Sequence, residues 1–148
     1  MAGLEGAGEI ARVLLGLHAD ARQGDADGCV EEGAELYQPR CELPARGYFF
    51  RPTLFTNVAM SHRIAREEIF GPVLSVLTFR TPEEAIEKAN NTPYGLSAGV
   101  WTEKGSRILM MTQRLKAGVV WANTCNRFDP TSPVGGFKES GYGREGGM

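Results

Sequence analysis

VLSVLTFRTPEE, at residues 73–84, predicts a strand that leads directly into a helix. Val73–Phe79 is a nearly continuous apolar run of strand length, which is typical of a strand buried in a sheet. Thr81 can accept a hydrogen bond as the N-cap of a helix, and Pro82 then takes the first helical position, where its missing N–H is not needed. Glu84 follows at the spacing of a capping box. We therefore expect a helix that begins at Pro82.

The alternation of strand and helix continues toward the C-terminus. Ser97–Trp101 predicts a second strand, Thr102 predicts the N-cap of a helix that runs to about Lys116, and Val119–Asn123 predicts a third strand. Strands of this apolar kind that alternate with helices are typical of parallel βαβ units with right-handed crossovers. We predict the α/β class, with parallel βαβαβ units, followed by a loop-like segment over residues 124–148.

The N-terminal part is less clearly patterned. Residues 10–17 have apolar side chains at helical spacing, Cys29–Tyr37 predicts a short helix, and Tyr48–Leu54 is an aromatic-rich extended stretch.

Composition excludes several classes of protein. The chain has 148 residues, 42% of them hydrophobic and 23% charged, which is typical of a globular domain that is soluble. A net charge of −2 gives no electrostatic reason to expect nucleic acid or a membrane surface as a partner. The three cysteines, Cys29, Cys41 and Cys125, have no metal-ligand spacing and indicate a reducing, cytoplasmic location. We expect no export signal, no membrane segment and no zinc site.

Glu68 and Phe70, directly before the first strand, are candidates for binding a nucleotide. In an extended chain, residues two apart project to the same side. A carboxylate can accept two hydroxyl hydrogen bonds, and an aromatic ring can cover a flat heterocycle, so the pair would suit a nucleotide sugar and its base. The alternative is that Glu68 is a solvated acid and Phe70 a core ring.

Other candidate sites carry a weaker signal. The chain contains neither of the standard glycine-rich phosphate loops. Cys125 follows the third predicted strand, at the end where open α/β sheets bind ligands, but no histidine is near it in the sequence. We therefore favour a structural role for each cysteine.

Five motifs in order give the chain a resemblance to a known family. From about Gly47 to Gly147 it resembles the C-terminal part of the catalytic domain of NAD(P)-dependent aldehyde dehydrogenases. The motifs are GYFFRPTL at 47–54, EEIFGPV at 67–73, ANNTPYGL at 89–96, GVVWAN at 118–123 and PVGGFKESGYGRE at 133–145.

The resemblance implies a fold, a cofactor and site residues. The pattern of residues 1–46 predicts a helical and loop lead-in, and the resemblance implies, over residues 47–148, the C-terminal portion of a catalytic domain with three α/β/α layers. Glu68 would bind the nicotinamide-ribose hydroxyls of NAD or NADP, and Phe70 would flank the nicotinamide. The loop after the third strand would line the aldehyde tunnel through Asn126, Phe128 and Val134.

The resemblance also implies what this chain lacks. In the family, the catalytic cysteine and the general-base glutamate precede the EEIFGP motif by more residues than this chain provides. We therefore expect a fragment of a homo-oligomeric enzyme that oxidises an aldehyde to a carboxylic acid, with no catalytic residue of its own and no activity alone. The alternative is a non-catalytic module, or pseudoenzyme domain, that pairs with full-length subunits.

Overall fold

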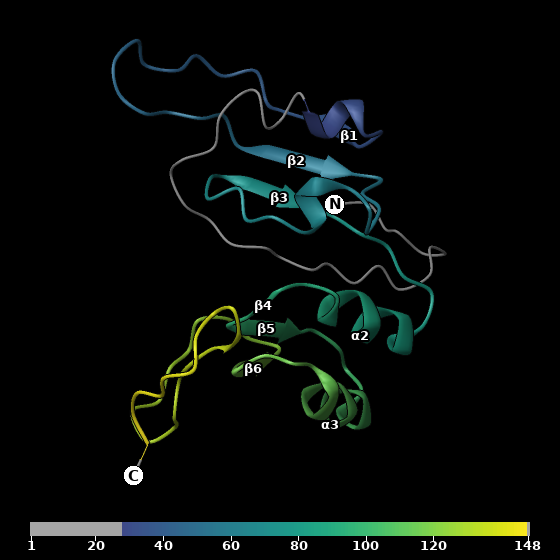
Figure 1. Ribbon diagram of the computed structural model, residues 1–148, viewed down its shortest axis with the longest axis vertical. Coiled ribbons are helices and arrows are strands. Elements are labelled where there is room, and N and C mark those ends of the chain that lie inside the picture. The colour runs from purple at the N-terminus through teal and green to yellow at the C-terminus, as the bar shows by residue number, and fades with distance from the viewer. Residues whose placement is uncertain (1–27, 148) are drawn as a thin grey trace. The chain divides into compact units, whose positions relative to one another are not determined.

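The computed structural model describes residues 28–147, which divide into two compact units, residues 28–78 and residues 79–147 (Figure 1). The helix predicted over residues 10–17 lies outside the described residues. The predicted division at residue 46 is not tested by these units and stays a prediction.

The unit of residues 28–78 is built on a sheet of three short strands. The strands are β1 (Glu35–Tyr37), β2 (Thr53–Thr56) and β3 (Val73–Ser75), in the order β1-β2-β3. β2 is antiparallel to β1 and parallel to β3. A 3-10 helix, η1 (Arg63–Ala65), lies in the connection from β2 to β3. Because β2 is central, both β1 and β3 form their interstrand hydrogen bonds with it.

The helix predicted over Cys29–Tyr37 is wrong beyond its first turn. Within this stretch the helix covers only residues 28–31, and residues 35–37 form β1 instead. Gly33 has φ of 100°, its N–H donates to the carbonyl of Val30, and the N–H of Ala34 donates to the carbonyl of Cys29. These two bonds around a left-handed glycine form a Schellman motif, which ends a helix.

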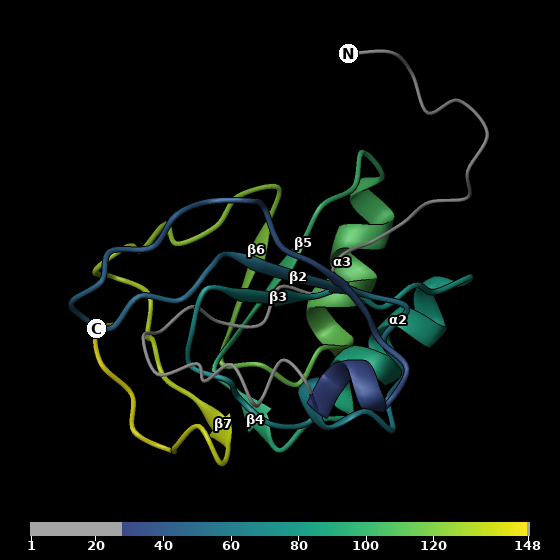
Figure 2. The same cartoon turned by 90° about the horizontal axis from the view of Figure 1, so that it is seen from above.

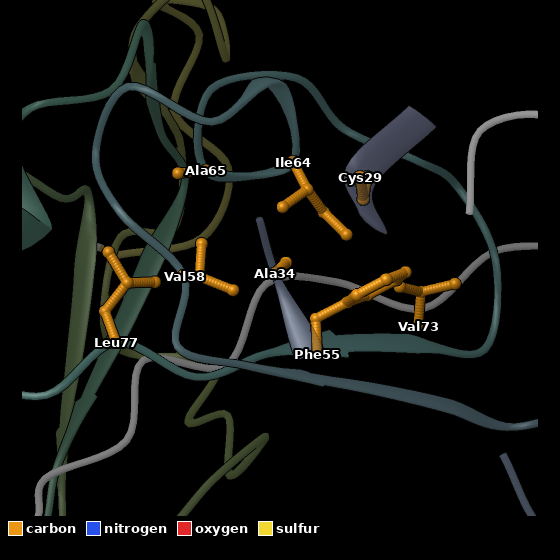
Figure 3. Close-up of a cluster of buried hydrophobic side chains, with 8 residues drawn as sticks. All are labelled: Cys29, Ala34, Phe55, Val58, Ile64, Ala65, Val73 and Leu77. Atoms are coloured by element: carbon orange, nitrogen blue, oxygen red, sulfur yellow. The ribbon is translucent and has the colours of Figure 1, made fainter. Parts of the chain in front are cut away.

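One apolar cluster lies beside the sheet (Figure 3). Phe55, at 1% exposure, is its most deeply buried member, and the ring lies next to the side chain of Val73. The alternate residues Val73, Ser75 and Leu77 are buried, so one face of this stretch is covered. Strand pairing stops at Ser75, which makes β3 shorter than the predicted strand at 73–79. The cluster as a whole contains Cys29, Ala34, Phe55, Val58, Ile64, Ala65, Val73 and Leu77.

The unit of residues 79–147 contains a parallel βαβ unit. It consists of β5 (Ser97–Val100), α3 (Gly105–Arg114) and β6 (Val119–Ala122), with β5 and β6 paired in parallel. The predicted helix α2 (Pro82–Asn90) precedes it and lies next to α3 (Figure 1). In addition, β4 (Tyr94–Gly95) pairs antiparallel with β7 (Phe137–Lys138) (Figure 2).

The predicted βαβαβ sheet is therefore only partly right. The predicted parallel unit of β5, α3 and β6 is present, but β3 and β5 belong to different sheets in the described part of the chain. In place of β5, β3 pairs in parallel with β2, which the sequence did not predict. The fold is mixed α/β with small sheets. β7 also lies inside the segment 124–148, which the sequence predicts as loop.

The N-cap predicted at Thr102 is wrong, whereas the one at Thr81 is confirmed. The Thr81 hydroxyl accepts from the N–H of Glu84. By contrast, α3 begins at Gly105 after Lys104. The Thr102 carbonyl, which an N-cap residue offers to the helix, instead accepts from Nδ2 of Asn123, whose Oδ1 accepts from the Thr102 N–H. The Thr102 hydroxyl accepts from the N–H of Lys104, before the helix begins. The pairing of Thr102 with Asn123 continues the β5–β6 contact past the end of the strands.

We predict that Phe55→Ala lowers the free energy of unfolding of the unit of residues 28–78 by about 3–5 kcal/mol, because the substitution leaves a cavity where a fully buried ring stood. Amide hydrogen exchange of β1, β2 and β3 measures this locally. The control is Phe49→Ala, which removes a ring that is 56% exposed and should change stability by about 0.5 kcal/mol or less. Equal effects of the two substitutions would contradict the assignment of Phe55 to the core.

We also predict a pH dependence from Glu84 in the first turn of α2. Hydrogen bonds from Lys88 and then from the Arg80 N–H hold the pKa of Glu84 below its usual 4.5. Because the folded-state pKa is lowered, this stabilisation is present above pH 4.5 and is lost as the pH falls through the folded pKa. Glu84→Gln should flatten the acid side of the stability curve, whereas Glu83→Gln, at an exposed neighbour in the same turn, should not. Thermal unfolding monitored by circular dichroism between pH 3 and pH 7 measures both, and identical curves for the two variants would disprove the role of Glu84.

Candidate functional site

The loop that carries Glu68 and Phe70 is fixed at both ends. On the η1 side, the N–H groups of Arg66 and Glu67 donate to the carbonyl of Arg63. On the β3 side, the carbonyl of Pro72 accepts from the N–H of Thr53, 2.8 Å away, so β2 holds the end of the loop.

The two glutamates of the motif have different surroundings. Glu67 Oε2 lies 2.8 Å from Arg63 Nε in an exposed ion pair. Within residues 28–147, the exposed Glu68 carboxylate makes no hydrogen bond or ion pair. Glu67 is therefore engaged in an ion pair within the protein, whereas the carboxylate oxygens of Glu68 are available to accept hydrogen bonds from hydroxyl groups of a ligand.

The two apolar residues of the loop, Ile69 and Phe70, have different surroundings. Ile69 packs against the core cluster, whereas Phe70 is 41% exposed. The alternative that Phe70 is a core ring is therefore disfavoured, because Ile69 takes the core position. Glu68 and Phe70, on either side of Ile69, are both presented to solvent.

The prediction that Glu68 and Phe70 project to the same side of an extended chain is not supported by the backbone at Phe70. Phe70 has φ of 57°, in the left-handed region, so alternation along an extended chain does not hold through this residue. For a bulky side chain this conformation is uncommon, costs about 1–3 kcal/mol, and occurs preferentially at ligand-binding sites. Directly after Phe70, the N–H of Val73 donates to the carbonyl of Gly71 and closes a tight turn around Pro72.

The substrate candidates Asn126 and Phe128 lie on one exposed loop that follows β6. Asn126 has φ of 55°, and Phe128 is 57% exposed. The loop ends in a turn at Asp129, whose carboxylate accepts from the hydroxyl of Thr131 at 2.6 Å and from its N–H at 2.8 Å. These bonds, the hydroxyl bond first, hold the pKa of Asp129 below its usual value.

The third candidate, Val134, is held by the C-terminal segment. Its N–H and carbonyl exchange hydrogen bonds of 2.7 and 2.8 Å with the backbone of Glu145. The next residue, Gly135, lies so close to Gly118 that a Cβ on Gly118 would overlap the Gly135 carbonyl. Val134 is half-buried, and its position depends on this contact.

Arg144 ties the turns of the C-terminal segment together. Its Nη1 donates to the carbonyls of Gly136 and Gly143, each at 2.8 Å, and its guanidinium lies 4.9 Å from the centre of the Phe137 ring. The sequence predicts a loop here, but the loop is held by specific side-chain bonds.

Lys138 is a residue whose role the sequence analysis missed. Its Nζ donates to the carbonyls of Asn90 and Thr92, at 2.8 and 2.9 Å, and so joins β7 to the end of α2. Desolvation, and then repulsion from Lys116, lower the pKa of Lys138. The Asn90 side chain in turn bonds the Arg114 carbonyl and the Lys116 N–H after α3. The only local signal is a lysine in a glycine-rich segment, and it does not identify an acceptor this far away in the sequence.

The cysteines contribute no further site. Cys29 is buried in the core, whereas Cys41 and Cys125 are exposed. No group of three or more potential metal ligands occurs among residues 28–147. Over the same described range, no helix has the length and apolar character that a membrane span requires.

The candidates thus form two sets. Glu68 and Phe70 belong to the unit of residues 28–78, and Asn126, Phe128 and Val134 belong to the unit of residues 79–147. Each set lies within one unit. The ligand-binding role of both sets stays a prediction.

Comparison with known proteins gives consistent matches. The sequence profile of the aldehyde dehydrogenase family matches residues 18–148. Retinal dehydrogenase 2 of Mus musculus is 48% identical over 118 residues, which are 80% of this chain and 23% of the relative.

Solved structures agree with the sequence matches. An NAD-dependent aldehyde dehydrogenase from Sinorhizobium meliloti is 43% identical, with a TM-score of 0.79 over 84% of this chain and 25% of the other. A Mycobacterium tuberculosis aldehyde dehydrogenase complexed with NAD+ is 42% identical, with a TM-score of 0.78 over 84% and 26% of the two chains. The chain spans about a quarter of the length of these proteins.

Proposed function

We propose, because this chain belongs to the aldehyde dehydrogenase family, that it forms the part of such an enzyme that anchors the nicotinamide ribose and lines part of the aldehyde passage. The observation that carries the proposal is the difference between the two glutamates. Glu67 is engaged by Arg63, whereas Glu68 is exposed and makes no internal bond within residues 28–147.

The residues of the loop suit a nucleotide sugar and its ring. The two carboxylate oxygens of Glu68 can accept from two neighbouring hydroxyl groups of a ribose. Phe70 offers an exposed ring face, held in place by a strained backbone and by the burial of Ile69 beside it. A nicotinamide nucleotide, when bound, supplies the hydride acceptor for aldehyde oxidation. NAD is favoured over NADP only because solved relatives contain NAD+.

The function of Glu68 in the reaction is to hold the ribose in position. Hydride transfer requires the donor and acceptor carbons to be close and aligned, so a small misplacement costs rate more than affinity. Asn126, Phe128 and Val134 would contact the aldehyde, with Val134 leaving more room than an aromatic side chain. The product is a carboxylic acid. The homo-oligomeric state and the cytoplasmic location stay predictions from the sequence.

We predict that Glu68→Gln lowers kcat by roughly 10- to 100-fold, with a smaller change in KM for the aldehyde. The assay uses a chimera in which the matching 118 residues of mouse retinal dehydrogenase 2 are replaced with those of this chain, and NADH formation is followed at 340 nm. The matched control is Glu67→Gln, which removes an exposed ion pair that should contribute little. An unchanged kcat for Glu68→Gln, or an equal loss for both variants, would remove Glu68 from this role.

A second candidate function is a non-catalytic module that pairs with full-length subunits. It is favoured by large apolar side chains exposed in the unit of residues 79–147, including Leu96 and Leu109. Exposed apolar side chains of this size favour association with another protein surface.

We predict that the isolated chain shows no aldehyde oxidation with NAD or NADP and that it self-associates. Activity with a short aldehyde, analytical ultracentrifugation and dye binding to exposed apolar surface measure this. Co-elution with the full-length relative in size-exclusion chromatography would support the module. Turnover at an ordinary dehydrogenase rate by a monomer that melts cooperatively would contradict both expectations.

A further inference from the structure

Trp121 links strand β6 to the loop that carries Asn126 and Phe128. Its indole Nε1–H donates to the carbonyl of Arg127 at 3.0 Å. Its ring also meets the ring of Phe128 edge to face, with centroids 5.4 Å apart and planes at 83°. This is a favoured aromatic geometry, and a buried or half-buried indole N–H ordinarily requires an acceptor. Trp121 is half-buried in β6, and through this bond and this ring contact it touches two successive residues of the loop.

The remaining anchors of the loop lie at its ends. Asn123 pairs with the backbone of Thr102 at the start, and Asp129 closes a turn with Thr131 at the end. Residues 124–128 have one hydrogen bond and one ring contact within the described part of the chain, and both run to Trp121. The middle of the loop is therefore held by a single side chain.

We propose that Trp121 is a positioning residue that sets the place of the Phe128 ring and thereby the affinity for aldehydes with an aromatic or long apolar tail. This inference rests on the proposed function, because it takes Phe128 as a contact of the aldehyde. Phe128 is 57% exposed although its ring meets the indole. That exposed ring surface can pack on an apolar tail, whereas an aldehyde without a tail gains little from it.

Trp101 provides a matched control. It stands directly after β5, as an indole that is 52% exposed, and its ring lies over Gly99. It is the other of the two tryptophans in the chain, and neither its ring nor its N–H bonds the loop at 124–128 in the described structure.

The test is a double-mutant cycle in the chimera described above, with Trp121→Phe, Phe128→Ala and the double variant. KM and kcat are measured for phenylacetaldehyde and for acetaldehyde. We expect Trp121→Phe to raise KM for phenylacetaldehyde about fivefold, which corresponds to one hydrogen bond of ordinary strength, with a smaller change in kcat and in KM for acetaldehyde. The double variant should match Phe128→Ala alone, because Trp121 acts through Phe128. Trp101→Phe should leave both KM values unchanged.

Failure of the inference and failure of the proposed function give different results. An inactive chimera, or a Phe128→Ala variant with unchanged KM for both aldehydes, would overturn the proposed function. A large effect of Phe128→Ala together with no effect of Trp121→Phe, or effects that multiply in the double variant, would overturn the positioning role alone.

A second substitution separates the hydrogen bond from folding. Replacing Trp121 with 3-benzothienylalanine keeps the shape of the ring and removes only the N–H donor. If Trp121→Phe unfolds the protein, this variant should still fold and should still raise KM for phenylacetaldehyde. An unchanged KM in this folded variant would show that the bond to the Arg127 carbonyl does not position the loop.

Discussion

The burial of Phe55 in β2 is the constraint on which the unit of residues 28–78 depends. β2 is the central strand, so it supplies hydrogen bonds to β1 on one side and to β3 on the other. Burial of the ring fixes which face of the sheet meets the core, because a shift of one residue would turn every side chain of β2 over. The same strand holds the Glu68 loop through the bond from Thr53 to Pro72. The cofactor candidates are thus positioned by a hydrophobic core to which neither of them belongs.

The unit of residues 79–147 is held together in a different way. α3 has no buried side chain, and β6 is only half-buried along its length. Besides the few buried apolar side chains, Ala85, Ile86, Val100 and Leu115, side chains that pair with distant backbone groups connect the elements. Asn90 joins α2 to the end of α3, and Lys138 joins α2 to β7. Such bonds contribute about 0.5–1.5 kcal/mol each, but they are directional and therefore fix positions closely. This suits a region whose loops carry the substrate candidates.

Each set of candidates includes a residue with a left-handed backbone. Phe70 has a left-handed backbone, and Asn126 has the same conformation in the loop after β6. Asparagine adopts it readily, whereas a bulky ring does so at a cost. Phe70 tolerates that cost because Ile69 and Pro72, on either side of it, are tied to the core and to β2. The strain is therefore supported by the surrounding packing, as expected at a binding site.

The sequence by itself determined the elements whose signals lie within a few residues of each other. Thr81, Pro82 and Glu84 predict the start of α2, and apolar runs around a helical segment predict the β5–α3–β6 unit. The sequence prediction ran a helix through Gly33 to Tyr37, and it was wrong because the left-handed backbone of Gly33 ends that helix. Only the tertiary structure decided which groups far apart in the chain would pair: Asn123 takes the backbone of Thr102 and moves the start of α3, Lys138 reaches Asn90, and Ile69 rather than Phe70 enters the core. The physical reason is that capping and turn bonds join neighbours in the chain, whereas these contacts form only when packing brings distant segments to hydrogen-bonding distance.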